Sequence, residues 1–306
     1  MDYTVAGVFS GVSGTSMEDC VALAGRFEGE LGYRPPNLET WVVRMSPGRI
    51  ETMFWGQRKW LSGIWRGPSG RIYVSDMDKV LHHREPDPDA SSTAAWTKHE
   101  AAGNMMGIRG IDDDYVMSWG LAEQSTPCVM LWEGSAWRRV GAPEFMIWDV
   151  HGSRRDLIFA VGDGGRIARW DGTRWTEMST PATGTLNAVF CVDDDEVYAC
   201  GRDRELLKGS SYGWTKVLDA EVGLHGVAKW RGEVWVGAAM PIGLCKLEDD
   251  GLVQVGPVLA TNFDVRGTLL FTTSEHIAES PDGVGFMATP IDNFLEIVAN
   301  DPPSWR

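Results

Sequence analysis

Residues 147–181 read IWDVHGSRRDLIFAVGDGGRIARWDGTRWTEMSTP, and this stretch decides the fold. It divides into four short segments in which apolar and polar residues alternate, and Gly or Asp residues separate the segments. Short alternating segments between turn residues predict β-strands, and the Asp171-Gly172 pair is typical of a hairpin turn. The stretch therefore predicts one four-stranded antiparallel sheet.

The same unit recurs along the chain at intervals of about 40 residues. Each copy opens with an apolar residue followed three positions later by Val or Ile, a marker that falls at Val8, Ile64, Ile108, Val150, Val189, Val227 and, in degenerate form, Val265. Seven such units predict an all-β, seven-bladed β-propeller with four antiparallel strands per blade, in a single domain over residues 1–306. The predicted blades span residues 1–56, 57–102, 103–143, 144–183, 184–221, 222–259 and 260–298.

Tryptophan marks many of the copies, since the chain has 15 Trp and 36 Gly residues. A Trp opens the fourth segment at Trp96, Trp137, Trp175 and Trp214, where it is expected to fill the space between blades. Residues 26–37 and 84–94 are expected to form surface loops. After the seventh copy, Phe294 to Val298 is expected to form an additional edge strand that closes the ring.

The segment AVGDGGRIARWDGTRWTEM, residues 160–178, resembles the repeat of bacterial propellers distantly related to kelch and BNR-repeat proteins. The resemblance is strongest over residues 147–217. The Trp-Asp pair of WD repeats occurs here only once, at Trp170-Asp171, and is not a regular feature. The turn 171–175 resembles an Asp-box only in part. The resemblance implies the fold, and it implies that the blade links and the loops between second and third strands share the usual binding face. It implies no activity, because propellers of this kind serve many functions.

The charge of the chain restricts its partners. With 28 basic and 43 acidic residues the net charge is −15, which argues against binding to nucleic acid or to an anionic membrane surface. The five Cys residues contain no CxxC pair, so neither a disulfide framework nor a zinc ribbon is indicated. No basic residue precedes Arg26 and no apolar run is long enough to span a membrane, so we expect a cytoplasmic protein.

Aromatic and cationic residues gather on the segments assigned to the usual binding face. Such residues dominate the energy of protein contacts, so they are the candidate partner-binding residues. They are Phe27, Tyr33, Arg34, Trp55, Arg58, Lys59, Trp60, Trp119, Phe145, Arg166, Arg202 and Arg204. A rival interpretation buries Trp55, Trp60 and Trp119 between blades. On the opposite face, the runs 112–114 and 193–195 consist of aspartates, which are expected to stabilise turns.

No catalytic residue, metal ligand or cofactor site is predicted. His82 and His83 are neighbours on a predicted strand and point to opposite faces, and His151 and His225 lie singly on inner strands. No GxSxG, HExxH or P-loop motif is present. The acidic residues nearest to inner positions provide no distinguishable catalytic pair; they are Glu18, Asp76, Asp78, Asp149 and Asp264.

These patterns favour a non-catalytic propeller that binds a protein partner through its loop face. One concrete hypothesis is an immunity-type protein that neutralises a basic secreted toxin, because the acidic charge would attract a basic partner. Two alternatives stay open. A carbohydrate or small-molecule binder requires Trp55, Trp60 and Trp119 to be exposed around one concavity, and a propeller glycoside hydrolase requires two carboxylates about 5–10 Å apart.

Overall fold

The computed structural model describes residues 5–28, 38–86, 95–249 and 251–300. Its strands form seven antiparallel sheets, each built from four strands that are consecutive in the chain. The predicted seven-bladed β-propeller is therefore confirmed. The chain divides into two compact units: unit 1 is Met1–Met105 with Asp264–Arg306, and unit 2 is Met106–Phe263.

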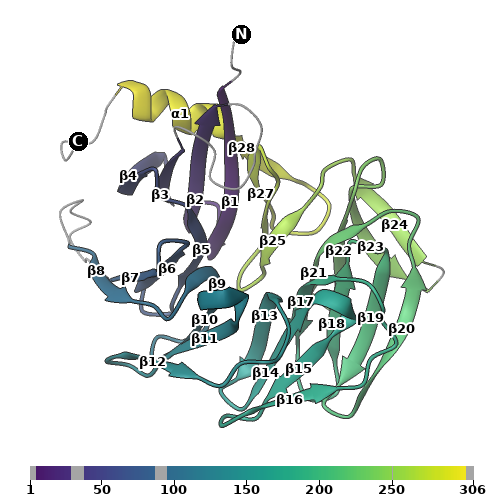
Figure 1. The fold of residues 1–306 in the computed structure, drawn as a ribbon. Coiled ribbons are helices and arrows are strands. Elements are labelled where there is room, and N and C mark those ends of the chain that lie inside the picture. The colour runs from purple at the N-terminus through teal and green to yellow at the C-terminus, as the bar shows by residue number, and fades with distance from the viewer. Residues whose placement is uncertain (1–4, 29–37, 87–94, 250, 301–306) are drawn as a thin grey trace. The chain divides into compact units, whose positions relative to one another are not determined.

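Unit 2 contains blades 3 to 6 (Figure 1). Blade 3 is β9 (Asn104–Asp112), β10 (Tyr115–Leu121), β11 (Pro127–Trp132) and β12 (Trp137–Val140). Blade 4 is β13 (Ile147–Arg154), β14 (Leu157–Gly162), β15 (Ile167–Trp170) and β16 (Trp175–Met178). Blade 5 is β17 (Leu186–Cys191), β18 (Val197–Gly201), β19 (Glu205–Ser210) and β20 (Gly213–Asp219). Blade 6 is β21 (Leu224–Trp230), β22 (Glu233–Ala238), β23 (Leu244–Glu248) and β24 (Gly251–Gly256).

Unit 1 contains blades 1 and 2, the C-terminal helix and blade 7 from Asp264 onward. Blade 1 is β1 (Val5–Ser16), β2 (Asp19–Glu28), β3 (Glu39–Ser46) and β4 (Arg49–Gln57). Blade 2 is β5 (Leu61–Arg66), β6 (Ile72–Asp76), β7 (Val80–Arg84) and β8 (Thr97–Glu100). Blade 7 is β25 (Thr261–Asp264), β26 (Leu269–Thr272), β27 (His276–Ser280) and β28 (Met287–Pro290), and helix α1 (Ile291–Asn300) follows it.

Burial within a blade falls from the inner strands to the fourth strand. Every residue of β14 is buried, whereas β16 of the same blade is half-buried at its ends and exposed between them. The cores lie between neighbouring sheets, as where Trp119 of blade 3 and Trp170 of blade 4 belong to one apolar cluster. Within blade 3 the Trp119 ring lies against the backbone of the adjacent strand β9, where a Cβ on Gly107 would lie 2.2 Å from the ring. Side chains between blades thus supply the buried apolar area.

The segment after blade 7 corrects one prediction, because Phe294 to Val298 lies in helix α1 and not in an edge strand. Its apolar residues Ile291, Phe294, Leu295 and Val298 follow the spacing of a helical face, not the alternation of a strand. Figure 1 shows α1 beside β1 and β28. Phe294 is 1% exposed and its ring meets Trp41 edge-on at 5.7 Å. The helix therefore covers an apolar surface of blade 1.

Hydrogen bonds join blades 1 and 7 within unit 1. The Phe9 amide donates to the Ser274 carbonyl at 2.9 Å, and the Thr268 amide donates to the Thr15 carbonyl at 3.0 Å. The carboxylate of Asp264 accepts from the Ser13 hydroxyl at 3.2 Å and from the Gly14 amide at 3.1 Å. The first and last blades are held by these contacts and by α1, while each keeps its own four strands.

Candidate partner-binding surfaces

The loop face of unit 2 consists of the segments at the sheet ends where the second strand leads to the third and the fourth leads to the next blade. It comprises the short 3-10 helices η1 (Glu123–Ser125) and η2 (Asp163–Gly165) and residues 141–146, 179–185, 202–204, 220–223 and 239–243. Antiparallel strands alternate in direction, so these segments leave each sheet at one end. These loops contact the blade links, as where the Ala239 amide donates to the Gly223 carbonyl at 2.8 Å.

Trp148 lies at the centre of an aromatic contact on this face. It is half-buried at the start of β13, and its indole Nε1 donates to the Asp163 carboxylate of η2 at 2.6 Å. The Arg202 guanidinium lies 5.7 Å from the Trp148 ring centroid, within the range of a cation–π contact. Sequence reasoning selected Arg202 and missed Trp148. The available signal was an aromatic residue between the two apolar markers Ile147 and Val150 of the repeat.

Loop 202–204 is held by its own aspartate. Asp203 accepts a hydrogen bond from the Thr185 amide at 2.8 Å, which ties this loop to the link between blades 4 and 5. Arg204 has a left-handed backbone with φ 74°, and its amide donates to the Gly201 carbonyl at 3.1 Å. Both flanking arginines, Arg202 and Arg204, are exposed. The loop therefore presents two cations from a hydrogen-bonded turn.

The other selected residues of unit 2 make internal contacts. Arg166 Nε donates to the Glu177 carboxylate at 2.6 Å, and its guanidinium lies 5.1 Å from the Phe145 ring. Phe145 is 4% exposed and Trp119 is 5% exposed. The structure therefore favours the rival interpretation for Trp119, and this ring has no exposed face for a sugar.

The selected residues of unit 1 differ in exposure. Arg58 is exposed, has φ 57°, and its amide donates to the Leu38 carbonyl at 2.7 Å. Lys59 Nζ lies 3.7 Å from the Asp76 carboxylate, and Phe27 is 4% exposed. Trp55 and Trp60 are half-buried, Trp55 against the apolar cluster that holds Trp41. Tyr33 and Arg34 lie outside the described residues.

The opposite face of unit 2 carries the aspartate turns. Asp112 accepts from the Asp114 amide and Asp193 from the Asp195 amide, each at 2.9 Å, so the first aspartate of each run closes an Asx turn. Two arginines in the corresponding turn of blade 4 form ion pairs with these aspartate turns of blades 3 and 5. Arg155 Nη2 donates to Asp112 at 2.7 Å, and Arg154 Nη1 donates to Asp194 at 2.7 Å. Arg154 and Arg155 are thus engaged in ion pairs between blades.

Inner carboxylates and histidines join strands. Asp149 accepts from the Val150 and Val189 amides at 2.9 Å, and burial raises its pKa to about 6. His151 Nδ1 accepts from the Cys191 amide at 3.1 Å, and burial holds the pKa of His151 well below its usual value. The contacts of Asp149 with Val189 and of His151 with Cys191 connect β13 to β17. Asp76 likewise accepts from the Val80 amide at 3.0 Å and contacts His82 Nε2 at 2.9 Å.

The described segments contain no group of three or more His, Cys, Asp or Glu side chains placed to hold a metal ion. All five cysteines are buried free thiols. Within the same segments, no helix has the length and apolar character needed to cross a membrane.

Comparison with known proteins identifies one curated relative and several structures of the same fold. Immune protein Tsi7 of Pseudomonas aeruginosa is 34% identical to this chain over 190 residues, which are 58% of each protein. The chain thus matches less than two thirds of the relative's length. No protein-family model matches the chain.

The solved structures confirm the fold. The WD40 propeller domain of Doa1 has a TM-score of 0.66 and 12% identity, covering 89% of this chain and 90% of that one. YCF48 bound to the D1 peptide has a TM-score of 0.61 and 11% identity, with 95% and 98% coverage. Chaetomium thermophilum Sqt1 bound to the N-terminus of ribosomal protein L10 has a TM-score of 0.55 and 10% identity, with 92% and 96% coverage.

Proposed function

We propose that this chain is a non-catalytic, immunity-type propeller that binds a toxic protein and neutralises it. The observation that carries the proposal is the 34% identity to Immune protein Tsi7 over 190 residues. The fold supports it, since two of the similar propellers were solved with a bound peptide or protein segment. A binding role is also supported by the inner polar residues Asp149, His151 and Asp76. Their carboxylates and ring form contacts that join neighbouring strands, so these groups have a structural role.

The partner is proposed to be a basic protein. The net charge of −15 gives the chain a negative field, which would raise the rate of encounter with a cationic partner. In the turns of blades 3 and 5, Arg154 and Arg155 pair with one aspartate each. Three other aspartates of these turns are exposed: Asp114, Asp193 and Asp195. The rate of encounter would thus depend on the net charge of the whole molecule and not on one ion pair.

The docking site is proposed to be the loop face of unit 2. Trp148 and Arg202 form an aromatic–cation pair there, and Arg204 and Met240 add exposed side chains, with Met240 55% exposed. Arg and Trp are enriched among residues that dominate binding energy. Loop 202–204 is already ordered by the Asp203–Thr185 hydrogen bond, so little conformational entropy is lost when a partner binds to it.

The test uses the full chain as an affinity bait in a native lysate of its source organism, followed by expression of each captured protein in a bacterial host. We expect one captured protein to stop growth when expressed alone and to lose that effect when this chain is co-expressed. A double variant, Trp148→Ala with Arg202→Ala, should lose protection, whereas Arg139→Ala, an exposed residue of β12, should keep it. Protection by both variants alike would exclude the loop face, and the absence of any toxic partner would contradict the proposed function.

A further inference from the structure

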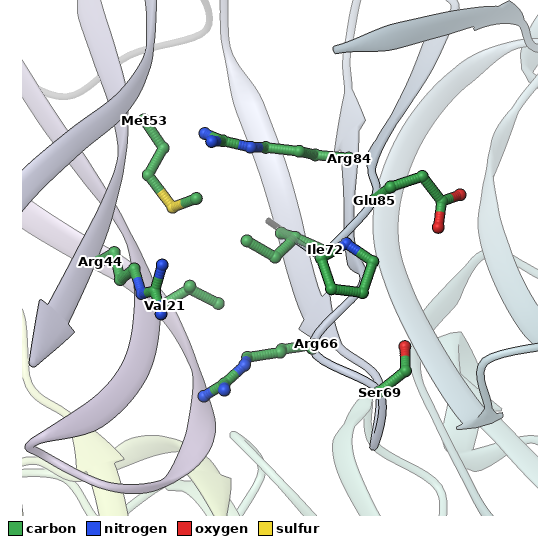
Figure 2. A pocket seen from close by; sticks show the side chains of 10 residues that line it. Val21, Arg44, Met53, Arg66, Ser69, Ile72, Arg84 and Glu85 are labelled. Carbon is green, nitrogen blue, oxygen red and sulfur yellow. The ribbon is translucent and has the colours of Figure 1, made fainter. Parts of the chain in front are cut away.

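A cavity of about 370 Å³ lies in unit 1 between the sheets of blades 1 and 2. Three arginines reach it from different strands: Arg44 from β3, Arg66 from the end of β5 and Arg84 from the end of β7. Figure 2 shows their guanidinium groups extending toward the same side of the cavity. The apolar residues Val21, Met53 and Ile72 also line it. Three converging cations are unusual in a chain whose net charge is −15.

The structure holds these arginines in place. Arg66 Nη1 donates to the Asp19 carbonyl at 3.1 Å and to its carboxylate at 2.5 Å, and the Arg66 amide donates to the Ser13 hydroxyl at 2.9 Å. Arg84 is 2% exposed. Arg44 is half-buried, and its side chain forms no hydrogen bond or ion pair with any residue that the structure describes. A bound group can therefore reach Arg44 without breaking an existing contact.

Each carboxylate near the cavity is paired with an arginine other than Arg44. Glu85 accepts from Arg71 Nε at 2.9 Å, and Figure 2 shows its carboxylate directed away from the three guanidinium groups. Glu51, which pairs with Arg44 across β3 and β4 in the sheet register, forms an ion pair with Arg49 at 2.6 Å. Burial opposes ionisation of Asp19, but hydrogen bonds from Thr15 and Arg66 and the charge of Arg44 hold its pKa below the usual value. The charge of Arg66 is thus balanced by Asp19, whereas Arg44 brings a positive charge to the cavity that forms no ion pair with the described residues.

We propose that this cavity binds a small organic oxyanion, a phosphate or carboxylate group attached to an apolar body. Guanidinium groups offer paired N–H donors that match the geometry of phosphate and carboxylate oxygens. The volume lies in the range of small-molecule sites, and the Val21, Met53 and Ile72 side chains provide a wall for an apolar body. The inference does not depend on the proposed immunity function.

The experiment titrates the full chain with phenyl phosphate, inorganic phosphate and benzoate by isothermal calorimetry. The buffer is free of phosphate and carboxylate, and the ionic strength is constant. We expect saturable one-to-one binding of phenyl phosphate or benzoate with a dissociation constant below about 1 mM. Stronger binding of phenyl phosphate than of benzoate would identify phosphate as the preferred group, and the reverse order would identify carboxylate.

Three variants locate the site. Arg44→Gln should weaken binding at least about tenfold, because it removes a charged donor. Ser69→Asp adds a negative charge at the exposed cavity rim and keeps a side-chain oxygen for the bond from the Arg71 amide, so it should also weaken binding. Arg139→Gln, at an exposed residue of β12 in unit 2, makes the same charge change as Arg44→Gln and should bind like the wild type.

Several results would overturn the proposal. One is the absence of saturable binding by all three anions up to about 10 mM, where a built site of this kind should be occupied. Another is wild-type affinity in both folded cavity variants, with folding checked by far-UV circular dichroism. Equal affinity for inorganic phosphate and phenyl phosphate would contradict the apolar wall, because the phenyl group would then contribute nothing.

Discussion

Trp170 and Trp175 lie directly opposite each other on β15 and β16, with ring centroids 5.4 Å apart. Blade 3 repeats the arrangement with Trp132 and Trp137, whose centroids lie 5.7 Å apart. In each pair the residue on the third strand is buried and its partner on the fourth strand is half-buried. The tryptophan at the start of the fourth segment is thus the outer member of a pair of tilted rings, and the inner member is the more deeply buried of the two.

This difference gives the first prediction. Trp170 is 1% exposed, and its Nε1 donates to the Tyr115 hydroxyl at 2.9 Å, so Trp170→Ala should lower the free energy of unfolding by about 3–5 kcal/mol. Trp175→Ala removes a half-buried ring and should cost about half as much. Urea unfolding monitored by circular dichroism measures both. Equal losses would show that the outer ring is packed as tightly as the inner one.

Asp149 gives a prediction about pH. Burial raises its folded-state pKa to about 6, above the value of about 3.9 in an unfolded chain. Its protonated form therefore contributes stability that is fully present below about pH 4 and is lost as the pH rises through about 6. Asp149→Asn does not titrate, and it places an amide donor where the Val189 or Val150 amide needs an acceptor. The wild type should therefore be more stable than this variant.

That advantage should shrink by up to about 3 kcal/mol between pH 4 and pH 7, which corresponds to the pKa difference. Urea unfolding of both proteins at several pH values measures it. An advantage that is independent of pH would show that the folded-state pKa of Asp149 is not raised.

At the level of elements, α1 packs on unit 1 through one face. Ile291 and Phe294 are buried in the cluster that contains Trp41, while Ile297 is 39% exposed. Gly7 on β1 permits this approach, because a Cβ there would lie 2.8 Å from Leu295 Cδ1 and 2.9 Å from Ile291 Cγ1. The helix and the first strand are thus matched in shape, although most of the chain separates them in sequence.

The helix supplies the next prediction. Phe294→Ala should lower the free energy of unfolding by about 3–4 kcal/mol, because it leaves a cavity beside Trp41. Ile297→Ala changes an exposed residue of the same helix and should alter stability by less than about 0.5 kcal/mol. Thermal and urea unfolding compare the two. Similar small effects for both variants would mean that α1 does not contribute to the core of unit 1.

For the whole molecule, the net charge of −15 acts on a partner before any contact forms. Under the proposed function, the association rate with a basic partner should fall several-fold between about 50 mM and 500 mM salt, because salt screens the attraction. Replacing Asp193 and Asp195 with Asn should lower the association rate at low salt and leave the dissociation rate unchanged, since these residues lie away from the loop face. Arg202→Ala should instead raise the dissociation rate.

Surface plasmon resonance with the captured partner separates these rates. Association that is insensitive to salt would contradict the steering role of the charge. A faster dissociation in the Asp193 and Asp195 variant would place those aspartates in the interface.

The number of blades and their four-strand pattern could be predicted from sequence, because a propeller repeats one local rule: alternating strands separated by turns at intervals of about 40 residues. The sequence also contains the helical spacing of Ile291, Phe294, Leu295 and Val298. The prediction of a strand there was wrong because it did not use this spacing of the apolar residues. Both features depend only on residues close together in the chain.

The candidate binding surfaces depend on contacts between residues that are distant in sequence. Trp148, Asp163 and Arg202 meet only when blade 5 packs on blade 4, and Phe145 is buried in a cluster that joins side chains of blades 3 and 4. Arg44, Arg66 and Arg84 share a cavity because two sheets face each other. Strand patterns are local and repeat along the chain, whereas the exposure and the partners of a side chain are set by packing between blades, which no single segment encodes.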